Sequence, residues 1–547
     1  MFNVKDNKQA YIFDPFEYLG PKRLADLKNS WAETFRSEIL PALPVESLRK
    51  YYHNKNGRPS KEMYSMLGLM ILQQMHDLTD EKAVGDFMFD TRWRYALDIP
   101  GDSDQEAFVS LKSLWTIRKH LIEDGLYTEM FEKATSKLAE LFKVEFDKQR
   151  LDSVHIQSNM RHLGRIALFS RTIKKFLLNL KRQHRTHYDQ LESARFKSYV
   201  NKQEEMLFAA VKPSETAKTL SLLAEDTHFL LRQFSSNEKV KSMSSFQLLS
   251  RLFKDQCTSV DDLENKGKKI ITAEPNHEVP SDSLQNPSDE DAGYCGHKGQ
   301  GYQVQVMETY SGDTDEKQLS LITHIEVESA DKHDANALLP ALKNTDKRDM
   351  SPKELLADSL YGSDDNVTKA KQDFQTDVLA PVMGTKSKDY GLDRFTLDRH
   401  NQITLCPQGK KPISVKKPND RFIAKFSRSD CASCPQLTNC PVIKYKKAYT
   451  YYYNQKMISI SKRRQYEDTE SFKKVYRYRA GIEATMSQFD RLTGVKNLRV
   501  RGLKAVSFAA TLKALGLNIL RSARFKYEHK VVLRYKKCRN THKCGLY

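Results

Sequence analysis

The sequence has few cysteines, few tryptophans and no long uninterrupted apolar stretch. Its 547 residues include 8 Cys and 3 Trp, and the best apolar candidate, FAATLKALGLNIL (508–520), is short and contains Lys513. We therefore expect no membrane span. The start, MFNVKDNKQAYIF, lacks the continuous apolar core of a secretory signal. The expected location is the cytoplasm, where cysteines serve more often as thiols or metal ligands than as disulfides.

Acidic residues are also scarce relative to basic ones. The chain holds 89 Lys and Arg against 70 Asp and Glu, which gives a formal net charge of +19. Such a balance favours a polyanionic partner, most commonly nucleic acid, although many basic proteins bind none. The length exceeds what one hydrophobic core usually organises, so several domains are expected.

Residues 1–146 have the pattern of a helical domain. The stretch MYSMLGLMILQQMHDLTD (63–80) is rich in Leu and Met, which is typical of a buried helix. Thr79 offers an N-cap for the next helix, with Asp80 and Glu81 in its first turn. Short consecutive helices in a basic protein fit either a DNA-binding unit or a plain packing domain, and the pattern does not separate the two.

Strand patterns occur on both sides of a second helical region. The segment EFDKQRLDSVHIQSN (145–159) predicts a strand that ends in polar residues. Residues 160–255 repeat apolar side chains at helical spacing, and 273–292 is rich in Pro, Ser and acids, which predicts an exposed loop. Two strands at 301–310 and 319–330, a helix and the short strand KELLADSLYG (353–362) follow. The predicted fold class is therefore α/β, with a helical insertion in its core.

Three acidic residues stand out by their places in these elements. Asp152 and Asp358 each follow apolar residues of a predicted strand and begin a polar stretch, and strand ends commonly carry ligands. Glu483 lies on a later helix, beside an apolar stripe at helical spacing. A two-metal Mg²⁺ site needs acids from separate elements. The plain alternative for Glu483 is an ion pair with Arg479 on the helix surface.

Five stretches together link the chain to a known family. They are GRPSKEMYSMLGLMILQQMHDLTDEKAVGDFMFDTRWRY (57–95), LDSVHIQSNM (151–160), NPSDEDAGYCGHKGQGYQVQVMET (286–309), LLADSLYGS (355–363) and YRYRAGIEATMSQFDRLTGVKNLRVRGLKAV (476–506). With them the sequence resembles, over nearly its whole length, bacterial insertion-sequence transposases of the DDE type. The resemblance implies an RNase H-like catalytic core in which Asp152, Asp358 and Glu483 are the catalytic acids and hold Mg²⁺ or Mn²⁺.

The implied activity is metal-dependent DNA strand cleavage and strand transfer at the ends of the protein's own insertion sequence. The implied partners are double-stranded DNA with terminal inverted repeats and further copies of the chain, and no membrane. A nuclease with the same core that does not join strands is one alternative. A catalytically impaired DNA-binding regulator is the other.

The resemblance also implies DNA contacts around Glu483. Tyr476, Arg479 and Glu483 match a Tyr-x-x-Arg-x-x-x-Glu motif of related transposases, in which the Arg positions phosphate. On a continuous helix the three side chains fall within roughly 60° of one another. The motif usually continues to a Lys where this chain has Asp490. Either Arg491 substitutes for that Lys, or the phosphate contact is weaker and the copy is impaired.

Four cysteines before the Glu483 helix have the spacing of metal ligands. Cys406 precedes CASCPQLTNC (431–440), which supplies Cys431, Cys434 and Cys440. Four thiolates suit tetrahedral Zn²⁺, so one structural zinc in a knuckle-like insertion is expected, with ordinary reduced thiols as the alternative.

Other cysteines and histidines have simpler explanations. Cys257 and Cys295 show no partner spacing. Cys538, His542 and Cys544 lie in a basic tail that fits a phosphate-binding or disordered extension better than a second metal site. His297, between glycines, is better explained by a structural hydrogen bond than by catalysis, and the same caution applies to His155 and His333.

The predicted organisation has seven segments. These are a helical N-terminal domain (1–146), the first part of the catalytic core (147–160), the helical insertion with an acidic loop (161–292), the second part of the core (293–400), the cysteine-rich insertion (401–449), the third part with the Glu483 helix (450–521) and a basic tail (522–547).

Overall fold

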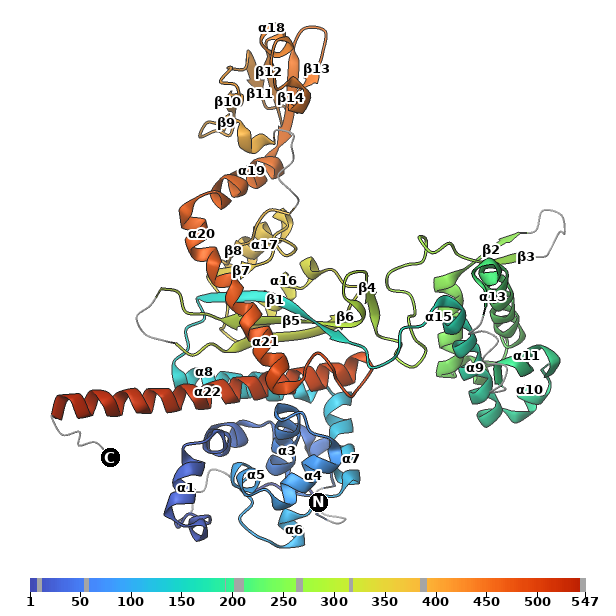
Figure 1. Ribbon diagram of the computed structural model, residues 1–547, viewed down its shortest axis with the longest axis vertical. Coiled ribbons are helices and arrows are strands. Elements are labelled where there is room, and N and C mark those ends of the chain that lie inside the picture. Colours follow the sequence, from blue (N-terminus) through green and yellow to red (C-terminus); the bar gives the residue numbers. More distant parts are fainter. Residues whose placement is uncertain are drawn as a thin grey trace.

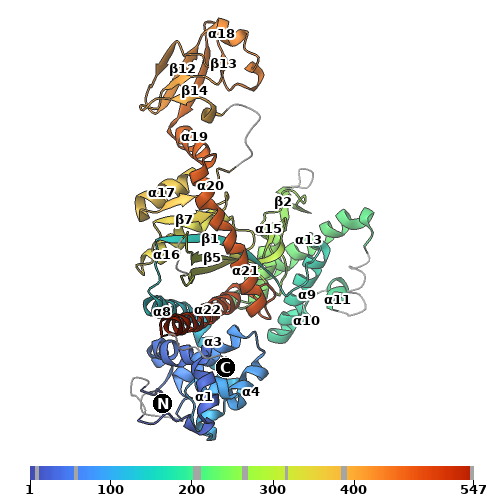
Figure 2. The ribbon, with the colours of Figure 1, turned by 60° about the vertical axis from the view of Figure 1, so that its left-hand side comes forward.

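The computed structural model describes residues 1–6, 12–53, 59–191, 193–200, 211–261, 269–313, 318–383 and 391–541. Figures 1 and 2 show a helical N-terminal region, a central sheet with its covering helices, a helical insertion beside the sheet and a small second β region beyond its far end. The predicted α/β class with a helical N-terminal region is confirmed.

Short helices joined by tight turns build the N-terminal region. Thr79 is the N-cap that the sequence predicted, since its hydroxyl accepts a hydrogen bond from the Lys82 N–H. The Leu- and Met-rich helix is almost completely buried. The helices are α1 (Pro21–Lys28), α2 (Trp31–Thr34), α3 (Met63–Met75), α4 (Asp80–Phe89), α5 (Thr91–Ala96), α6 (Asp104–Ala107), α7 (Leu111–Glu123) and α8 (Leu126–Phe142).

A mixed sheet of six strands forms the centre of the molecule. Its order is β4-β5-β1-β7-β8, and β6 pairs with β5 next to β4. β1 runs antiparallel to β5 and parallel to β7, which in turn is parallel to β8. The strands are β1 (Lys148–Gln157), β4 (Gly293–Cys295), β5 (Gly299–Thr309), β6 (Ile322–Ser329), β7 (Glu354–Ala357) and β8 (Asp377–Leu379).

The two faces of this sheet pack into different cores, because side chains alternate along each strand. Leu151 and Met307 pack with α16 (Leu338–Asp346) and α17 (Asp364–Phe374). Val154 and Val306 face the other way and join a core with the N-terminal helices and the last two helices. The long C-terminal helix therefore lies between the sheet and the N-terminal region (Figure 1).

Four helices carry the chain back across the sheet toward its end. They are α19 (Gln455–Glu467), α20 (Glu470–Tyr476), α21 (Gly481–Thr493) and α22 (Leu503–Thr541). α22 continues without a break past residue 521, where the sequence suggested that a tail begins. His542 and Cys544 lie outside the described residues, and of Cys538 only its place in α22 is described.

Part of α22, Leu503–His529, is the one stretch of the described chain long and apolar enough to cross a membrane. From the sequence this stretch was not expected to span a membrane, because it is short and contains Lys513. That residue is buried, and its ammonium donates a 2.8 Å hydrogen bond to Asp77 Oδ1 and another to the Thr493 carbonyl. Most of the apolar window is buried against the N-terminal helices and the sheet, as expected of a core helix.

The insertion after β1 is helical, as predicted, and has a core of its own. It contains α9 (Arg165–Gln183), α10 (Arg185–Asp189), α11 (Ser193–Val200), α13 (Thr216–Gln233), α14 (Glu238–Lys241), α15 (Ser244–Gln256) and the hairpin β2 (Cys257–Asp261) with β3 (Lys269–Ala273).

The following segment, 273–292, is less exposed than its composition predicted. Asp289 is only 2% exposed, and it accepts hydrogen bonds from the hydroxyls of Ser158 and Tyr302 and from the Gly502 N–H. The prediction of an exposed loop was wrong at this residue because its partners come from distant parts of the chain.

The second β region holds the four clustered cysteines and a small aromatic core. It contains β9 (Thr396–Leu397), β10 (Ile403–Leu405), β11 (Ser414–Lys416), β12 (Arg421–Phe426), α18 (Arg428–Ala432), β13 (Ile443–Lys444) and β14 (Tyr449–Asn454). Figure 1 shows it connected to the sheet through α19 and α20.

Candidate active site

The register of two neighbouring strands places Asp152 beside Asp358. β1 and β7 are parallel, and the last pair in their register is Leu151 with Ala357. The next residue on each strand is an aspartate. Both aspartates were expected at strand ends. This is correct for Asp358, but Asp152 lies in the middle of β1, which continues to Gln157 along β5. Its polar neighbours were mistaken for a turn, although they remain in the sheet.

Glu483 reaches the same place from α21. Ile482, Met486 and Phe489 are buried, so the predicted apolar stripe packs this helix on the sheet. The helix is not continuous with α20, because a 3₁₀ turn at Arg477–Ala480 separates them. The assumption of one regular helix from residue 476 to 490 was therefore wrong, although Arg479 and Glu483 still meet.

One guanidinium joins the three acids. Arg479 Nη2 lies 2.9 Å from Asp152 Oδ2 and 3.8 Å from Asp358 Oδ2, and Arg479 Nη1 lies 2.9 Å from Glu483 Oε1. The predicted ion pair of Arg479 with Glu483 is thus present, but it is one of three. The Asp152 side chain is 17% exposed and that of Glu483 is 67% exposed, so the group opens to solvent on the helix side.

Burial raises the pKa of Asp152 above its ordinary value. The opposite charge of Arg479 counteracts this change, while Asp358 and Asp334 act in the same direction as burial. Asp334 was not singled out from the sequence. It is held by Gln305, whose amide donates a 2.9 Å hydrogen bond to it. The positive charge of Arg479 therefore partly balances the negative charges of the neighbouring carboxylates.

The carboxylates have the donor chemistry that a hard divalent cation requires, since Mg²⁺ prefers oxygen ligands. Within the described ranges, however, no three Asp, Glu, His or Cys side chains are arranged closely enough to hold a metal ion. Asp152, Asp358 and Glu483 are instead spread around the Arg479 guanidinium. The carboxylate oxygens therefore suit a divalent metal ion as ligands. In this structure the three acids are arranged as ion-pair partners of Arg479.

Tyr476 lies against this site, whereas Arg491 does not. The Tyr476 hydroxyl donates a hydrogen bond of 3.2 Å to the carbonyl of Ala357, the residue before Asp358. Arg491 is exposed, turned by roughly 80° from Glu483 around the helix, and lines a separate cavity of about 440 Å³.

Asp490 has a local structural role. Its Oδ1 accepts a hydrogen bond of 3.1 Å from the Lys496 N–H, and its Oδ2 lies 3.9 Å from the Lys496 ammonium. The carboxylate therefore stabilises the turn that follows α21. This role differs from the phosphate contact that the resemblance implies for a Lys at this position.

Two further charged residues near the site were not identified from the sequence. Glu308 on β5 is fully buried and pairs with Arg150 on β1. Both lie on the same strand faces as Val306 and Asp152, because side chains alternate. A charged residue at an apolar position of the pattern Tyr302, Val304, Val306 was the signal that could have revealed a buried ion pair.

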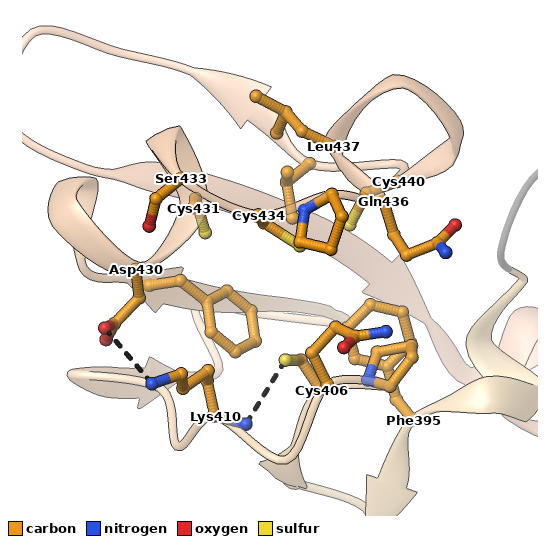
Figure 3. A pocket seen from close by; sticks show the side chains of 15 residues that line it. Phe395, Cys406, Lys410, Asp430, Cys431, Ser433, Cys434, Gln436, Leu437 and Cys440 are labelled. Atoms are coloured by element: carbon orange, nitrogen blue, oxygen red, sulfur yellow. Dashed lines mark hydrogen bonds and ion pairs between the residues drawn. The ribbon is translucent and has the colours of Figure 1, made fainter.

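The four clustered cysteines line one small cavity of about 180 Å³ in the second β region (Figure 3). All four are free thiols. Burial, together with the neighbouring thiols, raises the pKa of Cys431 to about 11. The backbone N–H of Lys410 donates a hydrogen bond of 3.4 Å to Cys406 Sγ. The residues gather as the spacing predicted, but they do not form a metal-binding arrangement in the described chain.

The three histidines have different surroundings. His297 is exposed in the turn between β4 and β5 and makes no hydrogen bond to the described part of the chain, so the predicted structural bond is absent. His333 caps the turn before α16 by accepting from the Ala335 N–H. His155 is half-buried on β1, and burial lowers its pKa.

Comparison with known proteins gives two matches. A protein-family model described as a Transposase DDE domain matches residues 405–523, which include the four clustered cysteines and Glu483. A second, described as a Transposase domain (DUF772), matches residues 26–120 of the helical N-terminal region. A search of the curated proteins finds no match. The two family matches confirm that this chain resembles insertion-sequence transposases of the DDE type.

Proposed function

We propose that this protein cuts DNA strands at the ends of its own insertion sequence and joins them to a target, with Mg²⁺ or Mn²⁺ as cofactor. The observation that carries the proposal is the meeting of Asp152, Asp358 and Glu483, from three separate elements, around one cation. Both transposase matches agree with a role in transposition. A central mixed sheet in which parallel neighbours carry the two aspartates supports an RNase H-like core.

In this proposal Asp152, Asp358 and Glu483 hold the metal ions. When bound, these ions supply activation of water or a DNA 3′-hydroxyl and stabilise the leaving oxygen. Arg479 positions the phosphate. Its Nε–H is buried and finds no acceptor among the described residues, so the acids leave one donor of this guanidinium unpaired. Tyr476 supports the backbone next to Asp358 through its bond to Ala357.

The proposed partner is double-stranded DNA that carries the terminal inverted repeats, bound by a homo-oligomer in the bacterial cytoplasm. The net charge of +19 favours such a polyanion. Arg491 and the helical N-terminal region are proposed as further DNA contacts. A structural Zn²⁺ held by Cys406, Cys431, Cys434 and Cys440 completes the proposal, supported by their common cavity.

A strand-joining assay on element-end DNA tests the proposed chemistry. The ends are identified from inverted repeats in the DNA that flanks the gene. A transposase produces nicks and joined products, a nuclease with the same core produces only nicks or breaks, and a DNA-binding regulator produces neither. Absence of joined products, with cleavage retained, would favour the nuclease.

Substitution of Glu483 tests the site. Glu483→Gln keeps the shape of the side chain but removes a negative metal ligand, so cleavage should fall by orders of magnitude while DNA binding persists. Asp152→Asn and Asp358→Asn should behave alike, and their effects should not add, because the three ligands act as a unit. Glu470→Gln is the matched control, since Glu470 forms only an exposed ion pair with Lys473. Near-normal cleavage by Glu483→Gln would refute the assignment.

A further inference from the structure

A buried carboxylate connects the strand that carries Asp152 to the helix that carries Glu483. Glu308 on β5 is 0% exposed. Its Oε1 accepts a hydrogen bond of 2.7 Å from Arg150 Nε. The Thr485 hydroxyl lies 2.8 Å from both carboxylate oxygens. Arg150 is two residues before Asp152, and Thr485 is two residues after Glu483.

Three more contacts complete this network, which we call the Glu308 network (Glu308, Arg150, Thr485 and Arg521). Arg150 Nη1 donates a hydrogen bond of 2.8 Å to the Tyr478 carbonyl in the 3₁₀ turn that carries Arg479. Arg521 on α22 donates to Glu308 Oε2 at 2.9 Å and to the Thr485 hydroxyl at 2.7 Å. One carboxylate thus ties together β1, α21 and α22.

The beginning of α21 is fitted closely to this network. A Cβ atom at Gly481, the first residue of the helix, would lie 2.0 Å from Arg150 Nη1. Any other residue would therefore displace either the helix or the guanidinium. Because Gly481 has no side chain, the Arg150 guanidinium can pass close to the first residue of α21 and reach the Tyr478 carbonyl.

The Glu308 network fixes the rotation and the axial position of α21, which apolar packing alone does not. The contacts of Ile482, Met486 and Phe489 hold α21 on the sheet, but apolar contacts are not directional. Hydrogen bonds to Thr485 and Tyr478 are directional, and they fix the helix in rotation and along its axis. Glu483 itself is largely exposed and has only Arg479 as an ionic partner in the described chain. Its position relative to Asp152 therefore depends on how α21 is placed.

We propose that Glu308 is a positioning residue that sets the distance between Asp152 and Glu483 by holding Arg150 and Thr485. The inference rests on the proposed function, because it assigns the network to the assembly of the metal-binding acids. Glu308 itself touches neither substrate nor metal. Supporting residues of this kind commonly change metal affinity or activity by about 10- to 100-fold when they are lost.

Thr485→Val tests the inference with little change of shape. The full-length protein, bound to element-end DNA, is titrated with Mn²⁺ and free Mn²⁺ is measured by electron paramagnetic resonance. Thr485→Val should weaken Mn²⁺ binding by about tenfold or more. Thr485→Ser, which keeps the hydroxyl, should restore most of the affinity. The Mg²⁺ concentration for half-maximal cleavage should shift in parallel.

The same helix offers a matched control. Thr493 is also buried on α21, but its hydroxyl donates to the Phe489 carbonyl of its own helix. Thr493→Val should leave Mn²⁺ affinity unchanged. Arg521→Lys is a second variant, which weakens the network from α22 and changes no residue of α21, and it should also lower Mn²⁺ affinity.

Three outcomes would overturn the inference. Wild-type affinity in Thr485→Val would do so while leaving the proposed function intact, as would an equal loss in Thr485→Val and Thr493→Val. A wild-type protein that binds no Mn²⁺ and cleaves no end DNA would overturn the proposed function and this inference together.

Discussion

At the scale of single residues, the Arg479 guanidinium lies among three carboxylates. Its guanidinium contacts acids from β1, β7 and α21. Three carboxylates so close together repel one another unless a positive charge lies among them. Arg479 therefore stabilises this group of acids, and in the proposed function a divalent cation has to compete with it.

This competition predicts the effect of Arg479→Gln. Without the guanidinium the acids keep their mutual repulsion, so Mn²⁺ binding in the absence of DNA should become several-fold tighter, while DNA affinity falls. Isothermal titration calorimetry measures the change in Mn²⁺ affinity. Arg477→Gln is the control, because Arg477 lies in the same turn but pairs with Asp313 at 2.7 Å. Equal Mn²⁺ affinity in the two variants would contradict the idea.

The second residue-scale prediction concerns Asp490. Asp490→Lys places the family's positive charge on this part of α21, so DNA affinity and cleavage should rise if the departure is a defect. The variant also loses the acceptor for the Lys496 N–H, which should lower the free energy of unfolding by about 1 kcal/mol. Asp490→Asn keeps that acceptor and should leave stability unchanged. Thermal unfolding and DNA binding separate the two effects, and weaker DNA binding by Asp490→Lys would exclude a simple charge defect.

At the scale of elements, the cysteine-rich β region makes a prediction about metal. Zinc analysis of the purified protein should find close to one Zn²⁺ per chain, and Cys431→Ser should remove it and destabilise this region. Cys257→Ser is the control, because Cys257 lies on β2 in the helical insertion. Full zinc occupancy in a protein that lacks all four clustered cysteines would end the proposal.

The proposed zinc site should also respond to pH. The pKa of Cys431 is raised to about 11, chiefly by burial, so its thiol is protonated near neutral pH when no metal is bound. Binding then releases a proton, and the apparent Zn²⁺ affinity should increase as the pH rises. Competition with a chelator at two pH values measures this. An affinity that does not change with pH would argue against thiolate ligands.

Local patterns predicted elements well where neighbours in sequence determine them. The N-cap at Thr79 and the stripe of Ile482, Met486 and Phe489 are examples, since both depend on residues within one or two turns. The 3₁₀ turn before Gly481 was missed. Its geometry depends on Arg150, which is more than three hundred residues away in the chain.

The resemblance predicted which acids come together, but not how they are arranged. Motif resemblance selected Asp152, Asp358 and Glu483, and the structure brings them together. Their adjacency follows from the register of Leu151 with Ala357, and strand pairing between distant segments leaves no local signal. Asp289 was missed for the same reason, because its hydrogen-bond partners come from distant parts of the chain, whereas the apolar strand position of Glu308 was a local signal.

At the scale of the whole molecule, the excess of basic residues predicts how DNA binding depends on salt. In the proposed function the formal charge of +19 favours several phosphate contacts, each of which would release condensed counterions. The affinity for duplex DNA should therefore fall steeply between low and moderate salt. A nearly flat dependence, measured by fluorescence anisotropy at several salt concentrations, would mean that the charge is not used for binding.

Salt also separates general attraction from recognition of the element ends. Phosphate contacts bind all sequences alike and weaken together as salt rises, whereas contacts with base edges persist. At moderate salt the protein should thus prefer end DNA to a random duplex of equal length.

Loss of this preference on removal of residues 1–146, with salt-dependent binding retained, would assign recognition to the helical N-terminal region. That region shares its core with α22, so circular dichroism must first establish that the shortened protein folds. Equal affinity of the intact protein for both duplexes would exclude end recognition and favour a nuclease that cuts without regard to sequence.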